Sequence, residues 1–175
     1  CKRNNVVLIH ISTDYVFDGE KKEPYSVTDI PSPINEYGKS KLKGEQYIQK
    51  ILDEYFIVRT SWLYSEFGHN FYKTVLRKAN AGETLNVTDA QTGCPTDANN
   101  LAKYIVNDLV LKENQYYGIH HFTDGVPMTW FGFAKEILRI NGLVSSTKVV
   151  KDNNYRSFVK RPRNSVLTLN INQTE

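Results

Sequence analysis

Val6-Val7-Leu8-Ile9-His10-Ile11-Ser12-Thr13-Asp14 is the stretch that decides the fold of this 175-residue chain. Its first six residues are aliphatic apart from one histidine, which is typical of a strand buried on both faces of a parallel sheet. From about 35 to 53, apolar residues recur at helical spacing, and 56–60 (FIVRT) has the pattern of a second buried strand. Strand, helix and strand in this order predict a right-handed crossover unit.

Beyond residue 62 the sequence predicts shorter elements of both kinds. We expect helices at 70–81, 97–111 and 129–140, and strands at 84–88, 118–123 and 148–151. Asp97 and Thr129 are suited to cap two of these helices, and Gly82 and Gly142 to end two. The fold class is therefore α/β, with a sheet in the first third and a smaller, less regular part after it.

Composition excludes several classes of protein. With 40% hydrophobic and 23% charged residues, and no apolar run of the ~18 residues that a membrane span needs, we expect neither a membrane nor a disordered protein. A net charge of +3 argues against nucleic acid as a partner. Two cysteines, Cys1 and Cys94, are too few for a disulfide framework, so we expect a reducing compartment, the cytoplasm.

Tyr37 and Lys41 form the most informative pair in the sequence. Residues four apart share a face of a helix, and this face continues through Gly44, Ile48 and Tyr55, the apolar stripe that we expect to pack on the sheet. An ammonium near a phenol favours the phenolate, so the pair is suited to give a proton to a carbonyl. A second interpretation stays open, in which Tyr37 is a surface aromatic and the Lys41 side chain only extends along the stripe.

This pair belongs to a longer pattern of motifs. It comprises residues 12–19 (STDYVFDG), 37–45 (YGKSKLKGE) and 59–64 (RTSWLY), followed by the shorter stretches 70–71, 91–96 and 161–167. In this order the motifs resemble those of the extended short-chain dehydrogenase/reductases and, within them, of the dTDP-4-dehydrorhamnose reductases. The similarity spans nearly the whole chain.

The resemblance implies an activity and roles for four residues. The activity is NADPH-dependent reduction of the C4 keto group of dTDP-4-dehydro-L-rhamnose to dTDP-L-rhamnose, for cell-surface polysaccharide synthesis, with NADH as the other candidate cofactor. Tyr37 would protonate the C4 oxygen, Thr13 would hydrogen-bond the same oxygen, and Lys41 would hold the nicotinamide ribose. Tyr37, Lys41 and Thr60 would thus contact the cofactor, and a homodimer is compatible with the family.

The resemblance also implies a division of the chain. Residues 1–64 would be the catalytic portion of a Rossmann-like NAD(P)-binding domain, and 65–175 mostly a substrate-binding part, with 97–116 packing back on the sheet. None of the ten glycines forms the closely spaced turn that receives a pyrophosphate. We therefore expect the first half of the cofactor domain to lie upstream of Cys1 and this chain alone to lack competent NADPH binding.

Further residues are candidates for holding the nucleotide sugar. Tyr15 and Trp62 are suited to form walls for the sugar or thymine, or else belong to the core. Asn70 could meet a pyrophosphate at a helix start, or serve as an ordinary cap. Arg161 could face an anionic nucleotide, or belong to a solvated run of charge.

The histidines predict no catalytic metal. His10 lies within the first strand, where a satisfied core or sheet-face residue is expected. His120 and His121 are neighbours in a predicted strand, so they should point to opposite faces and cannot share a metal.

Two other functions remain open beside the reductase. A non-catalytic, reductase-like regulatory subunit could keep Thr13, Tyr37 and Lys41, and a nucleotide-sugar 4-epimerase would use the same Tyr and Lys. A dehydratase is disfavoured, because such enzymes are expected to place Glu after Asp14, where this chain has Tyr15.

Overall fold

The computed structural model describes residues 1–112, 115–154 and 157–169. Its main sheet has three parallel strands in the order β1 (Leu8–Thr13), β2 (Tyr55–Thr60) and β7 (Gly118–His121). The expected α/β class and the parallel pairing of the first two predicted strands are confirmed. The first strand begins two residues later than predicted and extends to Thr13, so Val6 and Val7 precede it and are exposed.

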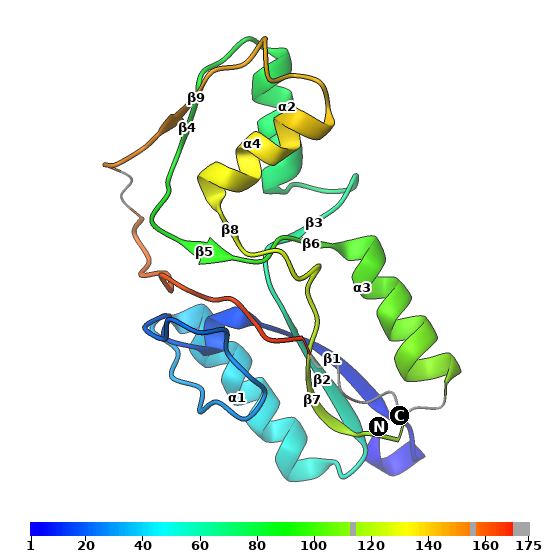
Figure 1. Cartoon of the computed structure of the whole chain (residues 1–175). Helices are drawn as coiled ribbons and strands as arrows, with labels where there is room; N and C mark the ends of the chain where they lie inside the picture. Colours follow the sequence, from blue (N-terminus) through cyan, green and yellow to red (C-terminus); the bar gives the residue numbers. More distant parts are fainter. Residues whose placement is uncertain (113–114, 155–156, 170–175) are drawn as a thin grey trace.

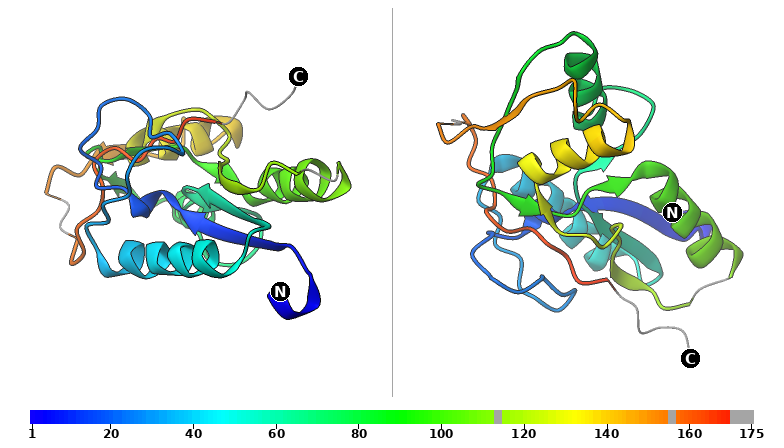
Figure 2. Two further views of the ribbon diagram at one scale, coloured as in Figure 1. Left: turned by 90° about the horizontal axis from the view of Figure 1, so that it is seen from below. Right: turned by 45° about the horizontal axis from the view of Figure 1, so that its top comes forward.

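Helices cover both faces of this sheet (Figures 1 and 2). On one face, Leu101 and Leu109 pack against Phe56 and Val58. They belong to α3 (Ala98–Tyr104) and to the π-helical segment Ile105–Leu111 that continues it. On the other face lies α1 (Glu36–Ile51). Because side chains alternate along a strand, Ile57 and Arg59 point toward α1.

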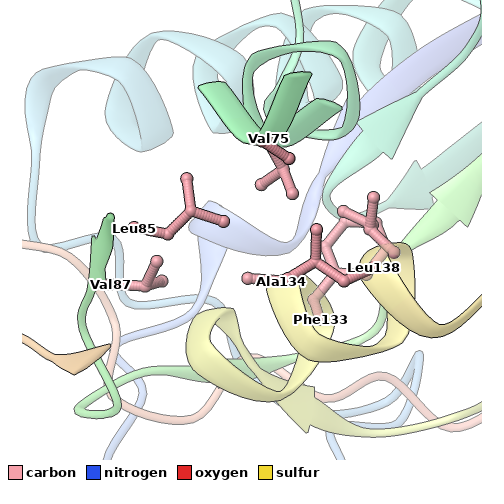
Figure 3. Packing of buried hydrophobic residues seen from close by; sticks show 8 residues of the cluster. Val75, Leu85, Val87, Phe133, Ala134 and Leu138 are labelled. Atoms are coloured by element: carbon pink, nitrogen blue, oxygen red, sulfur yellow. The ribbon is translucent and has the colours of Figure 1, made fainter. Parts of the chain in front are cut away.

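A second group of elements stands apart from the main sheet (Figure 1). Its helices are α2 (Phe71–Asn80) and α4 (Trp130–Ile140), and its longest strands, β4 (Leu85–Val87) and β9 (Val149–Lys151), pair in parallel. Apolar side chains from α2, β4 and α4 form one core (Figure 3), comprising Val75, Ala79, Leu85, Val87, Phe133, Ala134, Ile137 and Leu138. This burial holds the two helices together.

Three shorter connections join the two groups. β3 (Leu63–Tyr64) pairs with β6 (Thr96–Asp97), and β5 (Thr92–Gly93) pairs with β8 (Met128–Thr129). The C-terminal tail crosses the same region (Figure 1): Arg163 accepts a hydrogen bond from the Thr92 amide, and the Tyr25 amide donates to Val166.

The predicted helix starts are confirmed by capping side chains. Four residues accept a hydrogen bond from a backbone N–H in the first turn: Asn35, Asn70, Asp97 and Thr129. Each satisfies a donor that the helix itself leaves unpaired. In the described part of the chain, none of the helices is long and apolar enough to cross a bilayer.

The predicted sheet-facing stripe of α1 is wrong in part. Tyr37 was expected within that stripe, but its side chain is 55% exposed. The residues of α1 that are buried are Gly38 and Glu45. An ion pair explains why Glu45, which the apolar stripe did not include, is buried: its carboxylate faces the sheet because Arg59 of β2 lies beneath it.

Candidate functional site

The carboxyl ends of β1 and β2 present the two predicted hydroxyls. Thr13 and Thr60 are opposite each other in the strand register, and both are buried. The Thr13 hydroxyl accepts a hydrogen bond from the Tyr15 amide at 3.2 Å and so begins the 3-10 turn Asp14–Val16. The Thr60 hydroxyl has no hydrogen-bond partner among the described residues. Buried polar groups usually have a partner, so Thr60 is suited to receive a ligand group.

The start of α1 docks directly on this turn. Asn35 caps the helix by accepting from the Gly38 amide at 2.8 Å. A Cβ at Gly38 would come within 2.1 Å of the Tyr15 carbonyl oxygen, so only glycine permits this approach. As a result the Tyr15 ring meets the Tyr37 ring edge to face, with 5.9 Å between centroids. The sequence motif contains this glycine, but its spacing alone does not reveal the contact.

Lys41 reaches the same junction from one turn further along α1. Its Nζ donates a hydrogen bond of 2.6 Å to the carbonyl oxygen of Ile11, two residues before Thr13. An ammonium has three donors, so two remain for other groups. Thr13, Tyr15, Tyr37 and Lys41 are therefore gathered where β1 ends and α1 begins, with the Tyr37 phenol exposed.

A buried ion pair, absent from the sequence-based site, supports this junction. The Arg59 Nη2 donates to Glu45 Oε2 at 2.7 Å and its Nε donates to Glu45 Oε1 at 3.1 Å. The Ser12 hydroxyl also donates to Glu45. Both charged side chains are 1% exposed. Glu45 and Arg59 both lie in the quoted motifs, but charge on a helix and on a strand is equally typical of surfaces.

Two buried titratable groups lie close to the junction. Burial raises the pKa of Asp14 to about 7. On the α1 face of the sheet, burial and the nearby Arg59 charge lower the pKa of His121 to about 3. His120 lies on the other face, where its Nδ1 is 3.0 Å from the Tyr104 hydroxyl, so the prediction of opposite faces is confirmed. His10 is half-buried on the α1 face, and that no metal binds stays a prediction.

Trp62 lies outside this junction, in an aromatic stack. Its φ of 46° is in the left-handed region, which is strained for a large side chain. The indole is stacked on Trp130 at 3.6 Å and 7°, and a Cβ at Gly93 would come within 2.6 Å of it. Trp130 in turn donates from Nε1 to the Gln91 side chain at 3.0 Å. Trp62 thus supports Trp130, a residue that the sequence argument missed.

Trp130 and Arg161 line one pocket of about 290 Å³. Its other walls are Phe71, Asn86, Val87 and Thr88. Asn70, beside it, uses its side chain locally: Oδ1 accepts from the Lys73 amide, and Nδ2 donates to the Ser65 and Phe67 carbonyls. An aromatic wall with a guanidinium at the edge suits a flat ring attached to an anion.

The C-terminal tail connects the pocket to the junction of β1 and α1. Asn35, which caps α1, donates from Nδ2 to the Lys160 carbonyl at 3.0 Å. Lys160 directly precedes Arg161 in the chain. This hydrogen bond therefore ties the start of α1 to the residue before the pocket wall. The predicted site residues thus fall into two groups. Thr13, Tyr15, Tyr37, Lys41 and Thr60 lie at or near the junction of β1, β2 and α1. Arg161 lines the pocket, while Trp62 contacts it through Trp130 and Asn70 precedes its wall residue Phe71.

Comparison with known proteins identifies relatives that match nearly the whole chain. The family model "RmlD substrate binding domain" matches residues 1–175. The dTDP-4-dehydrorhamnose reductases of Aggregatibacter actinomycetemcomitans and Sinorhizobium fredii are 37% and 36% identical, over 95% and 93% of this chain. A crystal structure of the Bacillus anthracis dTDP-4-dehydrorhamnose reductase, in complex with NADP, has a TM-score of 0.84 and 37% identity over 93% of this chain.

The matches cover only part of each relative. This chain spans 60% and 57% of the two curated relatives and 57% of the crystallised chain. The agreement in fold with that structure confirms the predicted Rossmann-like α/β class.

Proposed function

The chain belongs to the RmlD substrate-binding domain family, and on that premise we propose that the protein is an NADPH-dependent dTDP-4-dehydrorhamnose reductase. It reduces the C4 keto group of dTDP-4-dehydro-L-rhamnose to give dTDP-L-rhamnose for cell-surface polysaccharide synthesis. The observation that carries this proposal is the meeting of Thr13, Tyr37 and Lys41 at the carboxyl end of β1. We place the reaction in the cytoplasm, and a homodimer is compatible with it.

Each of the three residues has a distinct task. The exposed Tyr37 phenol gives its proton to the C4 oxygen as the keto group is reduced. The Lys41 ammonium, held by the Ile11 carbonyl, stabilises the phenolate that remains. The Thr13 hydroxyl donates a hydrogen bond to the C4 oxygen, where negative charge develops.

The chain offers groups that fit the nicotinamide half of NADPH. Thr60 has a buried hydroxyl without a partner among the described residues, and Lys41 has two donors beyond its bond to Ile11. These two residues and Tyr37 would hold the cofactor. When bound, NADPH supplies the hydride for C4.

The pocket lined by Trp130 and Arg161 accepts the nucleotide part of the substrate. Thymine would lie against the Trp130 ring, which Trp62 supports from behind, and the diphosphate would meet the Arg161 guanidinium. Tyr15 lies at the sugar end and Asn70 beside the pocket. In this assignment residues 1–64 are the catalytic portion and 65–175 mostly bind substrate, with 97–116 on the sheet.

The test uses the full-length protein and its exposed tyrosines. NADPH and dTDP-4-dehydrorhamnose are mixed with enzyme and the loss of absorbance at 340 nm is followed. Tyr37→Phe removes one hydroxyl, so kcat should fall by about 10²–10⁴-fold while the fold is retained. Tyr47→Phe is the matched control, because Tyr47 lies in the same helix and is 54% exposed.

The control variant should keep the wild-type rate. A Tyr37→Phe enzyme with near-normal kcat would remove Tyr37 from the mechanism. A wild-type protein that binds NADPH but oxidises none would support the non-catalytic regulatory subunit instead.

A further inference from the structure

Asp14 is a buried acid beside the hydroxyl that the proposed reaction uses. Its side chain is 2% exposed, and its Oδ1 accepts a hydrogen bond from the Thr13 hydroxyl at 3.0 Å. Its other oxygen, Oδ2, receives no hydrogen bond of normal geometry from the described residues. A buried carboxyl without a cation is costly, so its presence here needs an explanation.

The hydrogen-bond capacity of Thr13 makes this contact important. A threonine hydroxyl has one hydrogen to donate and two lone pairs. One lone pair accepts from the Tyr15 amide, and the single hydrogen points to Asp14. An ionised carboxylate can only accept, so beside ionised Asp14 the Thr13 hydrogen is not available for a substrate oxygen.

A protonated Asp14 reverses this arrangement. A neutral carboxylic acid has its own O–H and can donate to the Thr13 oxygen across the same 3.0 Å. The Thr13 hydrogen is then free to turn toward the C4 oxygen of the substrate. Only the direction of hydrogen bonds changes, and the heavy atoms need not move.

We propose that Asp14 is a positioning residue whose protonated form releases the Thr13 hydroxyl to donate to the substrate's keto oxygen, and whose ionised form withholds it. The inference rests on the proposed reductase function and assigns to the same site a pH-dependent control of its hydrogen-bond donor. It concerns Thr13 alone, because Tyr37 and Lys41 make no hydrogen bond to Asp14 in the described structure.

The surroundings of Asp14 suit such a control. Burial raises its pKa to about 7, and the Ser165 and Thr13 hydroxyls favour the ionised form without cancelling that effect. The largest contributions to this shift come from burial and from neighbouring hydroxyl and backbone groups. Cys94, which follows β5, is a titratable group near Asp14. Burial raises the pKa of its thiol, and the Asp14 charge raises it further. Both forms of Asp14 are therefore populated near neutral pH.

The activity test compares pH profiles of the full-length enzyme. In the wild type, kcat/KM should fall about tenfold between about pH 6 and about pH 8, as Asp14 ionises. Asp14→Asn presents an amide N–H₂ that donates to Thr13 at every pH, so this variant should keep the low-pH rate and lose that fall. Asp18→Asn is the control, because Asp18 lies in the same motif but its carboxylate bonds Tyr25 instead. It should keep the wild-type profile.

An Asp14→Asn enzyme with the wild-type midpoint and amplitude would overturn the proposal.

A second measurement needs neither substrate nor turnover. Carbon-13 NMR follows the Asp14 carboxyl of the full-length protein through a pH titration. Thr13→Val removes the hydroxyl that stabilises the ionised form, so the Asp14 midpoint should move to higher pH. An unchanged midpoint would overturn the inference. A shifted midpoint in a protein that reduces no substrate would instead contradict the proposed function.

Discussion

Gly38 and Gly44 show how the absence of a side chain at one position can decide where α1 docks. Both lie in α1, yet a Cβ at 38 would come within 2.1 Å of the Tyr15 carbonyl, whereas a Cβ at 44 would meet only the His10 ring at 4.0 Å. Gly38→Ala should lower the free energy of unfolding by about 1–3 kcal/mol through overpacking. It should also lower kcat, because Tyr37 moves with the helix. Urea unfolding and the reductase assay measure the two effects.

Gly44→Ala is the matched control for that change. Alanine is the better helix former by about 0.8–1.0 kcal/mol, so this variant should be as stable as the wild type or more stable, with an unchanged rate. If the two variants behave alike, the close approach of α1 to the Tyr15 carbonyl is not required.

At the scale of elements, the Glu45–Arg59 pair fixes α1 to the sheet. Glu45→Gln leaves a buried guanidinium without its carboxylate, which typically costs about 3–5 kcal/mol. We expect a loss of that size in urea unfolding. Glu36→Gln is the control, since among the described residues Glu36 pairs with the exposed Lys39 of the same helix, and exposed pairs contribute ~0.2–1 kcal/mol. A loss below 1 kcal/mol for Glu45→Gln would show that the pair is not what fixes the helix.

Local chemistry explains why so many elements could be predicted from sequence. A cap such as Asn35 or Thr129 acts within one turn, and its hydrogen bond joins residues only three positions apart. Short strands rich in β-branched and aromatic residues, such as 56–60, are equally local signals. The helix and strand positions, and the α/β class that follows from their alternation, therefore follow from short stretches.

Contacts between distant segments could not be predicted in the same way. The buried position of Glu45 on α1 depends on its ion pair with Arg59, two charges that single-sequence periodicity assigns to the surface. Trp130 reaches the pocket only because β8 pairs with β5 and directs the start of α4 toward Trp62. The motif resemblance pointed to most residues of the junction. The burial of the Asp14 and Glu45 carboxyls and the place of Trp130 in the pocket became visible only in the structure.

At the scale of the whole molecule, two buried groups give stability opposite pH dependences. His121 has a folded pKa of about 3 against an ordinary 6.5, so the unfolded chain takes up its proton first, and stability is lost as pH falls below 6.5. Asp14 has a folded pKa of about 7 against an ordinary 3.8, so the folded state keeps a proton that the unfolded chain releases. Its contribution is present below 3.8 and is lost as pH rises toward 7.

Between pH 3.8 and 6.5 these two slopes oppose each other and partly cancel in the wild type. Removing one group should therefore expose the other. Asp14→Asn should make stability rise more steeply from pH 4 to pH 6.5, because Asp14 no longer opposes the contribution of His121, whereas His121→Gln should make the slope with pH smaller or negative over the same range. Urea unfolding of the full-length protein at several pH values measures both curves. Variants whose curves run parallel to that of the wild type would mean that neither group changes its protonation on folding.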